Sequence, residues 1–539
     1  MLRYYIPNLL FSRDALFRGG LPLWNHREMF GMPMFATLEY GPLYPPNGLF
    51  LFLPCRAARL LTGGLHLWMF AIFMFLYLRQ SLRLGTAAAV LGAVTAAFSE
   101  WSVLHLCAVP DTYNSAVWIP LVLLLADRLE DAPGPGRAAA LGGALALQFF
   151  AGEAEISART GLLLAVYCVF RMAQRFLRGK NGRRVFSTVL WFGAAAVFSL
   201  GFAAVQIFPT AELSLLSVRG PNALSFETAF SGGLGSHAEL LHQLVAGSTG
   251  GNLLFTGLPV LALALFPLVR RKPAAEAVFF LLPAVLALEL LRGSDSWVAF
   301  MYFHFVPTGS WFQAPVRFAP FLLFSIAVLA ALGAQRLADD LEAAAEKRRL
   351  PAAPLLFLIF AGIAAFVADR LWSGFDTSLA ILTFVFMGLL PAVAALVRPS
   401  GRTGCGRAWT AAPALIPALA LMVCAWTCYP ASEFNLPKEP DLTGLDTAVQ
   451  SFLREHALQG QRVYADYALD GGRRVPKLGP LLGIACLNGQ SPFTLPEFYA
   501  RYSTCLTPRI RAKESEAGHA TSTGLRGGLS LGEGAGPLL

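Results

Sequence analysis

The chain has 539 residues, of which 55% are hydrophobic and 14% charged, and its mean hydropathy is +0.55. This composition is far more apolar and less charged than that of an average soluble protein, which excludes a chain that folds in water alone. The net charge of +9 lies in short Lys and Arg clusters between apolar runs, so it indicates basic cytoplasmic loops of a membrane protein and argues against a nucleic-acid partner.

Residues 1–64 are rich in Gly, Pro, Trp and Tyr and are predicted to form an extracytoplasmic loop on the membrane surface. Gly and Pro set tight turns, while Trp and Tyr anchor at the level of the lipid head groups. The loop is interpreted either as a structural cap over the helices or as the wall of a site for a lipid head group. Its candidate substrate-binding residues are Trp24, Asn25 and Tyr44.

Residues 65–429 are predicted to form a bundle of transmembrane helices, about 12 in number, because each apolar run approaches the roughly 20 residues that span a bilayer. Basic loops are predicted to be cytoplasmic, and the stretch 209–252 is predicted to be a long outer loop. The chain is therefore expected to be a multi-pass protein of the cell membrane, inner or plasma. The predicted spans begin near Leu65, Thr86, Thr112, Arg137, Ser157, Val185, Leu253, Ala274, Arg317, Leu350, Thr377 and Trp409.

The tail changes composition after Tyr429. Residues 430–510 contain short apolar pieces broken by Gly and Pro, which predicts a small mixed α/β extracytoplasmic domain. Residues 511–539 are Gly-rich and predicted to be disordered, because they hold too little apolar surface for a core.

Charged residues at the predicted outer boundary are candidate functional groups, because such groups are costly unless hydrated, paired or used. Glu153 and Glu155 could line an acceptor or metal site. Arg317 begins a span, where its guanidinium could bind phosphate oxygens or anchor the helix by snorkelling. Glu212 and Arg219 are about two helical turns apart, and a structural role for them is at least as plausible.

Several motifs support a family resemblance. The first loop contains G-x-L-P-L-W-N ending at Asn25, then Phe30-Gly31-Met32-Pro33, and then Tyr44-Pro45-Pro46. Later segments are Ala151-Gly152-Glu153-Ala154-Glu155, Gln206-Ile207-Phe208-Pro209-Thr210-Ala211-Glu212 and Phe312-Gln313-Ala314-Pro315-Val316-Arg317-Phe318. Together they resemble YfhO-type bacterial membrane proteins, although that family usually has Arg where this chain has Gln313.

The resemblance implies a GT-C architecture, that of polytopic glycosyltransferases which use a polyprenyl-phosphate sugar donor and an acidic residue near the first outer loop. It also implies that a first transmembrane helix carrying the main base precedes Met1, and that the C-terminal domain is only partly present. Glu39 is then the preferred catalytic carboxylate within the chain. Asp14 is the second candidate, although its amphipathic surroundings favour a solvated helix face.

The expected partners are the lipid-linked sugar donor, membrane lipids and a cell-surface glycan acceptor. No cofactor is identified, and a divalent metal is left open because a metal-assisted transfer would use the same carboxylates. The sequence has no nucleotide-binding or zinc-protease motif. Two alternatives stay open: a polytopic transporter or flippase, and an inactive scaffold relative of the transferase.

Overall fold

The computed structural model describes residues 2–27, 31–177, 182–217, 224–245, 254–268 and 274–346, together with two short strands. Apart from those strands, the regular structure of these residues is helical. By length and composition, four helical segments could cross a membrane, or five if the bent pair Thr86–Ala97 and Glu100–Cys107 is one span. The described part is thus an all-α polytopic bundle, and the predicted spans from Leu350, Thr377 and Trp409 lie outside it.

The N-terminal region is more helical than a surface loop. Helix α1 (Leu2–Phe17) is followed by the short turns η1 (Phe35–Thr37) and η2 (Pro45–Gly48) and by α2 (Leu49–Phe52). The first span, α3 (Cys55–Leu76), begins at Cys55 rather than near Leu65 and continues as the π-helical turn η3 (Tyr77–Ser81). Pro54 directly precedes α3, a position where proline's missing N–H costs nothing.

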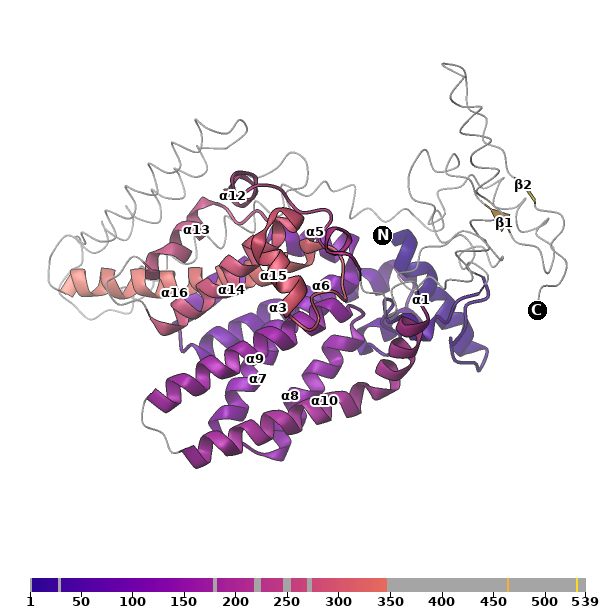
Figure 1. Ribbon diagram of the computed structural model, residues 1–539, viewed down its shortest axis with the longest axis horizontal. Coiled ribbons are helices and arrows are strands. Elements are labelled where there is room, and N and C mark those ends of the chain that lie inside the picture. Colours follow the sequence, from indigo (N-terminus) through magenta and orange to yellow (C-terminus); the bar gives the residue numbers. More distant parts are fainter. Residues whose placement is uncertain are drawn as a thin grey trace, which may run out of the picture.

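The predicted span from Thr112 is broken into short helices. Helix α4 (Thr86–Ala97) leads into α5 (Glu100–Ala108), whose N-cap is the Ser99 hydroxyl, and then into α6 (Pro110–Ala116) and α7 (Ile119–Asp131). Prolines stand in the first turn of both α6 and α7, where they favour helix starts. The break after Ala116 lets α6 remain at the end of the bundle while α7 runs back along it (Figure 1).

Helices α8 (Pro135–Phe150), α9 (Ala154–Leu177) and α10 (Gly182–Leu216) follow. The long packing of α8 on α10 needs Gly142, because a Cβ there would lie 2.7 Å from the Ala195 carbonyl oxygen. Helix α10 continues through Pro209 to Leu216, so the first residues of the predicted outer loop 209–252 are helical. The extra turns are held because Gln206 and Thr210 donate hydrogen bonds to the carbonyls of the η1 region, at 2.7 and 2.9 Å.

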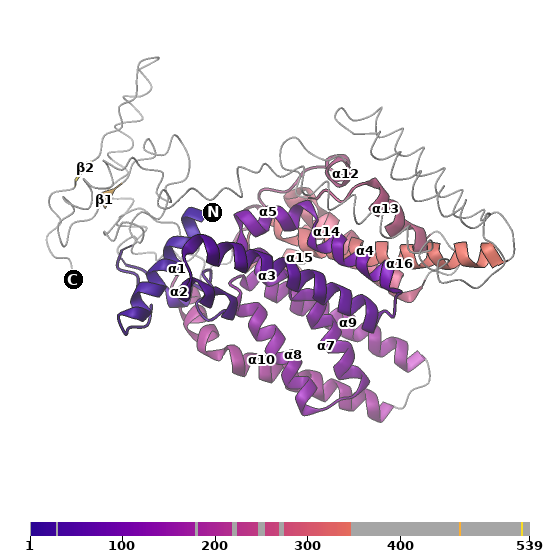
Figure 2. The ribbon, with the colours of Figure 1, turned by 180° about the vertical axis from the view of Figure 1, so that it is seen from behind.

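The remaining described chain contains α11 (Phe226–Ala229), α12 (His237–Val245), α13 (Leu258–Leu265), η4 (Phe266–Leu268), α14 (Ala275–Leu291) and η5 (Gly293–Asp295). They are followed by α15 (Trp297–Phe305), η6 (Pro315–Phe318) and α16 (Ala319–Glu346). Most of α16 is buried, packed against α4, α13 and α14 (Figure 2). Separately, β1 (Val463–Tyr464) pairs antiparallel with β2 (Ser530–Leu531).

The helices run roughly side by side, so the bundle has two ends. In Figure 1, α1 and α6 lie toward one end, while the C-terminal end of α9 and the N-terminal end of α10 lie at the other. The first-loop turns and the α8–α9 connection therefore meet near the same end, which is where the candidate site forms.

Candidate functional site

The site is assembled around a glycine between α8 and α9. Gly152 has φ +116°, and a Cβ on it would lie 2.8 Å from the Glu39 carbonyl oxygen and 3.2 Å from the Asp111 Cβ. A side chain at this position would therefore meet both strain and steric conflict. The glycine lets the first loop and the start of α6 approach the α8–α9 turn, which brings Glu39 and Asp111 together.

Backbone strain marks two segments that enter the site. Leu38, at φ +63°, directly precedes Glu39, and Ala314, at φ +82°, directly precedes η6 with Arg317. A positive φ is uncommon for residues with a Cβ and costs free energy unless surrounding contacts hold it. The unfavourable backbone conformations at Leu38 and Ala314 therefore set the direction of the segments that carry Glu39 and Arg317.

A narrow pocket with about 30 Å³ of free volume lies beside Glu39 and Asp111. That space holds about one or two water molecules. Asp111 is 4% exposed, and its Oδ1, like the Thr62 hydroxyl on the opposite helix α3, is buried without a hydrogen-bond partner. Buried polar atoms without partners suggest a place for water or a substrate hydroxyl. The polar lining residues are Tyr5, Glu39, Tyr40, Asn47, Arg59, Thr62, Asp111 and Asn114.

The carboxyl group of Asp111 is protonated more readily than an ordinary aspartate. Burial raises its pKa to about 8, with further upward contributions from the charges of Glu153 and Glu39, against a lowering hydrogen bond from Tyr5. A group that exchanges its proton near neutral to mildly alkaline pH suits general acid–base chemistry.

Next to this pocket, two arginines share buried carboxylates. Arg317 lies 2.7 Å from Glu155 Oε2 and 3.2 Å from Glu153 Oε2, while Arg159 pairs with the other oxygen of Glu155. The Thr112 hydroxyl also donates to Glu153 Oε2, at 3.3 Å. Glu155 is fully buried. Because a buried charge without a counterion is costly, its carboxylate keeps the two guanidinium groups close to it.

The ion pair with Glu155 uses only part of the hydrogen-bonding capacity of the Arg159 guanidinium group. Its guanidinium carbon lies 3.4 Å from the centre of the Phe318 ring, and the side chain is 7% exposed. Nε and Nη1 are buried and have no hydrogen-bond partner. Since an unsatisfied charged donor is expensive to bury, these two N–H groups are suited to an anionic ligand.

An apolar groove with about 400 Å³ of free volume begins at Arg159. Leu162, Leu163 and Val166 continue its wall along α9, and α14, α15 and the start of α16 supply the others. A groove lined by hydrocarbon with a cation at one end matches a lipid chain that carries an anionic head group. The walls from α14 to α16 are Phe279, Leu282, Pro283, Leu286, Ala287, Leu290, Val298, Met301, Tyr302, Phe305, Val306, Phe318 and Phe321.

Four residues singled out from the sequence meet at this site: Glu39, Glu153, Glu155 and Arg317. Asp14 lies elsewhere on α1, where its carboxylate is 44% exposed and 3.7 Å from Arg13, as expected for a solvated helix face. Arg219 lies outside the described residues. Both carboxylate oxygens of Glu155 pair with arginine, and a contact between Glu155 and substrate stays a prediction.

The aromatic and amide candidates of the first loop have other partners. Tyr44 is 1% exposed, and its hydroxyl is bonded to His66 Nε2 at 2.8 Å and to Trp118 Nε1 at 3.1 Å. Asn25 is fully buried and donates to the Asn8 side chain. Trp24 is half exposed and covers Gly31, where a Cβ would touch its ring. Tyr44 and Asn25 therefore support the fold of the loop through these bonds.

Sequence reasoning missed Asp111, Arg159 and the pocket residue Arg59. Arg159 had a usable signal, because it lies one helical turn after Glu155 within an apolar run, where an ionisable residue needs a partner. Arg59 donates to the Leu106 and Cys107 carbonyls at the end of α5, a long-range contact without a sequence signature.

Metal ligation by these carboxylates has little geometric support. Among the residues that the structure describes, no group of three or more His, Cys, Asp or Glu side chains is arranged to hold a metal ion. Glu153 and Glu155 both face Arg317, whose positive charge stands beside the oxygens that a metal would need.

No protein-family model and no curated protein matches the chain. Among solved structures, it is similar to ArnT from Cupriavidus metallidurans bound to undecaprenyl phosphate, with 16% identity over 94% of this chain and 85% of ArnT, at a TM-score of 0.49. The apo form of the same ArnT has 17% identity over 94% of this chain and 83% of ArnT, at a TM-score of 0.46. The mycobacterial arabinofuranosyltransferase AftD gives 15% identity over 88% of this chain and 29% of AftD, at 0.45.

Proposed function

We propose that the chain is a membrane glycosyltransferase that moves a sugar from a polyprenyl-phosphate carrier to a hydroxyl of a cell-surface glycan. The observation that carries the proposal is Arg159, which stands at the end of an apolar groove with two buried, unpartnered N–H donors. The groove suits the polyprenyl chain, and Arg159 with Arg317 suits the phosphate. The first-loop motifs that resemble YfhO-type proteins favour the same chemistry.

The transfer needs a base and a stabilised leaving group. In the proposed reaction, an acceptor hydroxyl in the narrow pocket attacks the anomeric carbon of the donor sugar and gives its proton to the Asp111 carboxylate. The bond between the anomeric carbon and the phosphate oxygen breaks with its electron pair, which leaves polyprenyl phosphate. Glu39 lines the same pocket and would accept a hydrogen bond from the acceptor, while the guanidinium groups stabilise the charge that develops on the phosphate.

The experiment uses the purified full chain in detergent, undecaprenyl-phosphate-linked sugars as donors and an isolated cell-surface glycan fraction as the acceptor, with release of undecaprenyl phosphate as the readout. Asp111→Asn is expected to lower the rate by about 100-fold or more, the usual contribution of a general base. The matched control is Asp14→Asn, because Asp14 lies on the exposed side of α1. Release that is unchanged by Asp111→Asn would contradict the proposed base.

A lipid flippase would use the same groove without a base. Transbilayer movement of labelled undecaprenyl phosphate in vesicles distinguishes the two functions, because a flippase should move the lipid and be insensitive to Asp111→Asn. Movement without sugar release from any donor would favour the flippase.

A further inference from the structure

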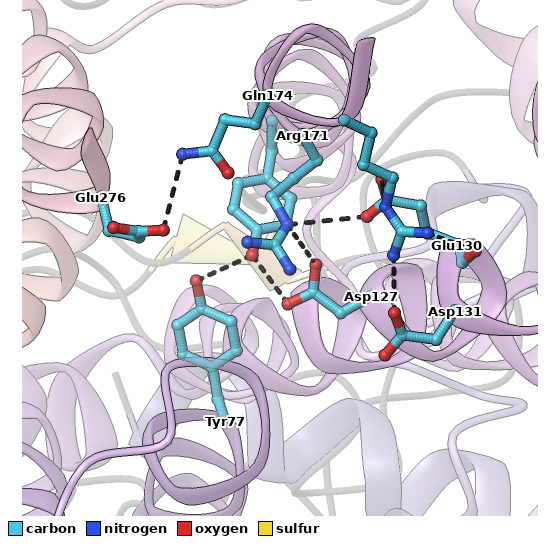
Figure 3. Close-up of polar contacts among 9 residues, drawn as sticks. Tyr77, Asp127, Glu130, Asp131, Arg171, Gln174 and Glu276 are labelled. Atoms are coloured by element: carbon cyan, nitrogen blue, oxygen red, sulfur yellow. Dashed lines mark hydrogen bonds and ion pairs between the residues drawn. The ribbon is translucent and has the colours of Figure 1, made fainter. Parts of the chain in front are cut away.

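A second charged cluster lies at the far end of α9 from the candidate site (Figure 3). Arg171 lies 3.0 Å from Asp127 and 3.6 Å from Glu130, both on α7, and Arg175 lies 2.5 Å from Glu130. These and four further residues, Tyr77, Asp131, Tyr167 and Gln174, make up what we call the distal cluster.

The distal cluster is mostly buried and crosses several elements. The Tyr167 hydroxyl donates to Asp127 at 2.8 Å and accepts from Tyr77 of η3 at 3.3 Å, while Gln174 donates to Glu276 of α14 at 3.5 Å. The Asp127 and Glu130 side chains are 5% and 3% exposed. Figure 3 shows Arg171 directed toward Asp127, with the Tyr77 hydroxyl pointing into the same cluster.

Stability alone is a weak reason for such a cluster. Burying ion pairs costs desolvation free energy that roughly cancels their attraction, so apolar side chains would hold the helices as well. What ion pairs add is direction, because carboxylate and guanidinium groups accept few relative positions. The cluster therefore fixes where α9 lies against α7 more than how tightly it is held.

Helix α9 needs contacts that fix its position, because one of its faces has little protein packed against it. Only 33% of the apolar stretch of α9 is buried inside the protein. Leu162, Leu163 and Val166 line the open groove. Its charged contacts lie at its two ends. At one end Glu155 pairs with Arg317, and Arg159 lies over the ring of Phe318; at the other end lies the distal cluster. The two ends are about 18 Å apart along the helix axis, from the rise per residue between Arg159 and Arg171.

We propose that the distal cluster positions α9, so that Arg159 stays at the phosphate end and the groove keeps the width that admits a polyprenyl chain. The proposal rests on the proposed function for the identity of the ligand. Since a helix of this length behaves as a stiff rod, a change of tilt at the distal end moves the groove wall and Arg159 together. Asp127, Arg171 and Tyr167 are then positioning residues that never touch the lipid.

The first test measures binding of undecaprenyl phosphate to the purified full chain by native mass spectrometry. Asp127→Asn keeps the shape of the side chain and removes its charge, and it is expected to raise the Kd about ten-fold, the scale of a coupling between linked sites. Arg171→Lys keeps the charge but loses the planar geometry of the guanidinium group, so its Kd is also expected to rise, by about three-fold. Arg128→Ala is the matched control, because Arg128 is exposed on the same helix and bonds Gln80 instead of α9.

If Asp127→Asn does not fold, Tyr167→Phe takes its place, since it removes one hydroxyl from the same carboxylate. Its Kd is expected to rise about three-fold, the scale of one neutral hydrogen bond. Folded variants of Asp127 or Tyr167 that bind the lipid as wild type does would overturn the proposal.

The second test reads the position of α9 without any lipid. Spin labels at Val166→Cys on α9 and Leu286→Cys on α14 face the groove from opposite walls, and both parent side chains are about two-fifths exposed. In a background without other cysteines, Asp127→Asn should shift or broaden the label-to-label distance, and Arg128→Ala should not. An unchanged distance would overturn the positioning role. A shifted distance in a chain that does not bind undecaprenyl phosphate would uphold positioning and reject the proposed function.

Discussion

Arg317 and Glu155 are 162 positions apart in the sequence and lie 2.7 Å apart in the structure. Their ion pair joins the start of the span Pro315–Asp340, the most deeply buried of the spans that the structure describes, to the first turn of α9. Glu155 also pairs with Arg159, so one buried carboxylate determines where both guanidinium groups stand.

Loss of that carboxylate charge should therefore destabilise the protein as well as the site. We expect Glu155→Gln to lower the free energy of unfolding by about 3 kcal/mol, because it leaves two largely buried guanidinium groups short of countercharge. Glu153→Gln is the matched comparison and should cost less, since the ion pair of Glu153 in the described structure involves one guanidinium group, that of Arg317, where Glu155 pairs with two. Unfolding of both variants in detergent measures the difference, and equal costs would contradict the central role of Glu155.

The pH dependence should follow Asp111. Its folded-state pKa of about 8 lies above the ordinary value of about 4, so the folded protein binds this proton more tightly than the unfolded chain does. The stabilisation from Asp111 is complete below pH 4 and is lost as the pH rises through 8. The rate of sugar transfer should rise over the pH range around 8, because the carboxyl group loses its proton there and can act as a base. Asp111→Asn should remove this contribution from the stability profile, and an unchanged profile would show that the carboxyl does not titrate there.

Gly152→Ala should disturb the site through the backbone. Its φ of +116° and the 2.8 Å approach to the Glu39 carbonyl leave no room for a methyl group, so we expect a loss of about 1–3 kcal/mol and slower sugar release. Gly143→Ala is the control, because a Cβ there meets nothing within 4 Å and α8 should gain about 0.5–1 kcal/mol. Thermal unfolding of the two variants should move in opposite directions.

Tyr44→Phe separates the fold of the first loop from substrate binding. Removing the hydroxyl leaves the Trp118 N–H and His66 without their buried partner, which should cost about 1–3 kcal/mol. Binding of undecaprenyl phosphate should be unchanged once the protein is folded. A weakened Kd in folded Tyr44→Phe would restore Tyr44 as a substrate contact.

Much of the helix pattern could be predicted from apolar runs, because long runs bounded by charges are sufficient evidence for a span. The predicted starts at Arg137 and Ala274 lie within two residues of α8 and α14. The break between α6 and α7 was missed because the run from Thr112 stays apolar across it. Glu153 and Arg317 were found from their place at a membrane boundary, whereas the burial of Asp111 depends on how the first loop approaches Gly152, which no local pattern encodes.

The most direct test of the central claim compares two lipids with the same tail, undecaprenyl phosphate and undecaprenol, for binding to the purified full chain. If the groove holds a polyprenyl chain and Arg159 with Arg317 holds its phosphate, the phosphate should be bound at least about ten-fold more tightly, as expected for a charge-assisted contact of about 1.5–3 kcal/mol. Arg159→Gln should reduce that preference, and Arg128→Ala should leave it unchanged. Equal affinities of the wild-type protein for the two lipids would contradict the account.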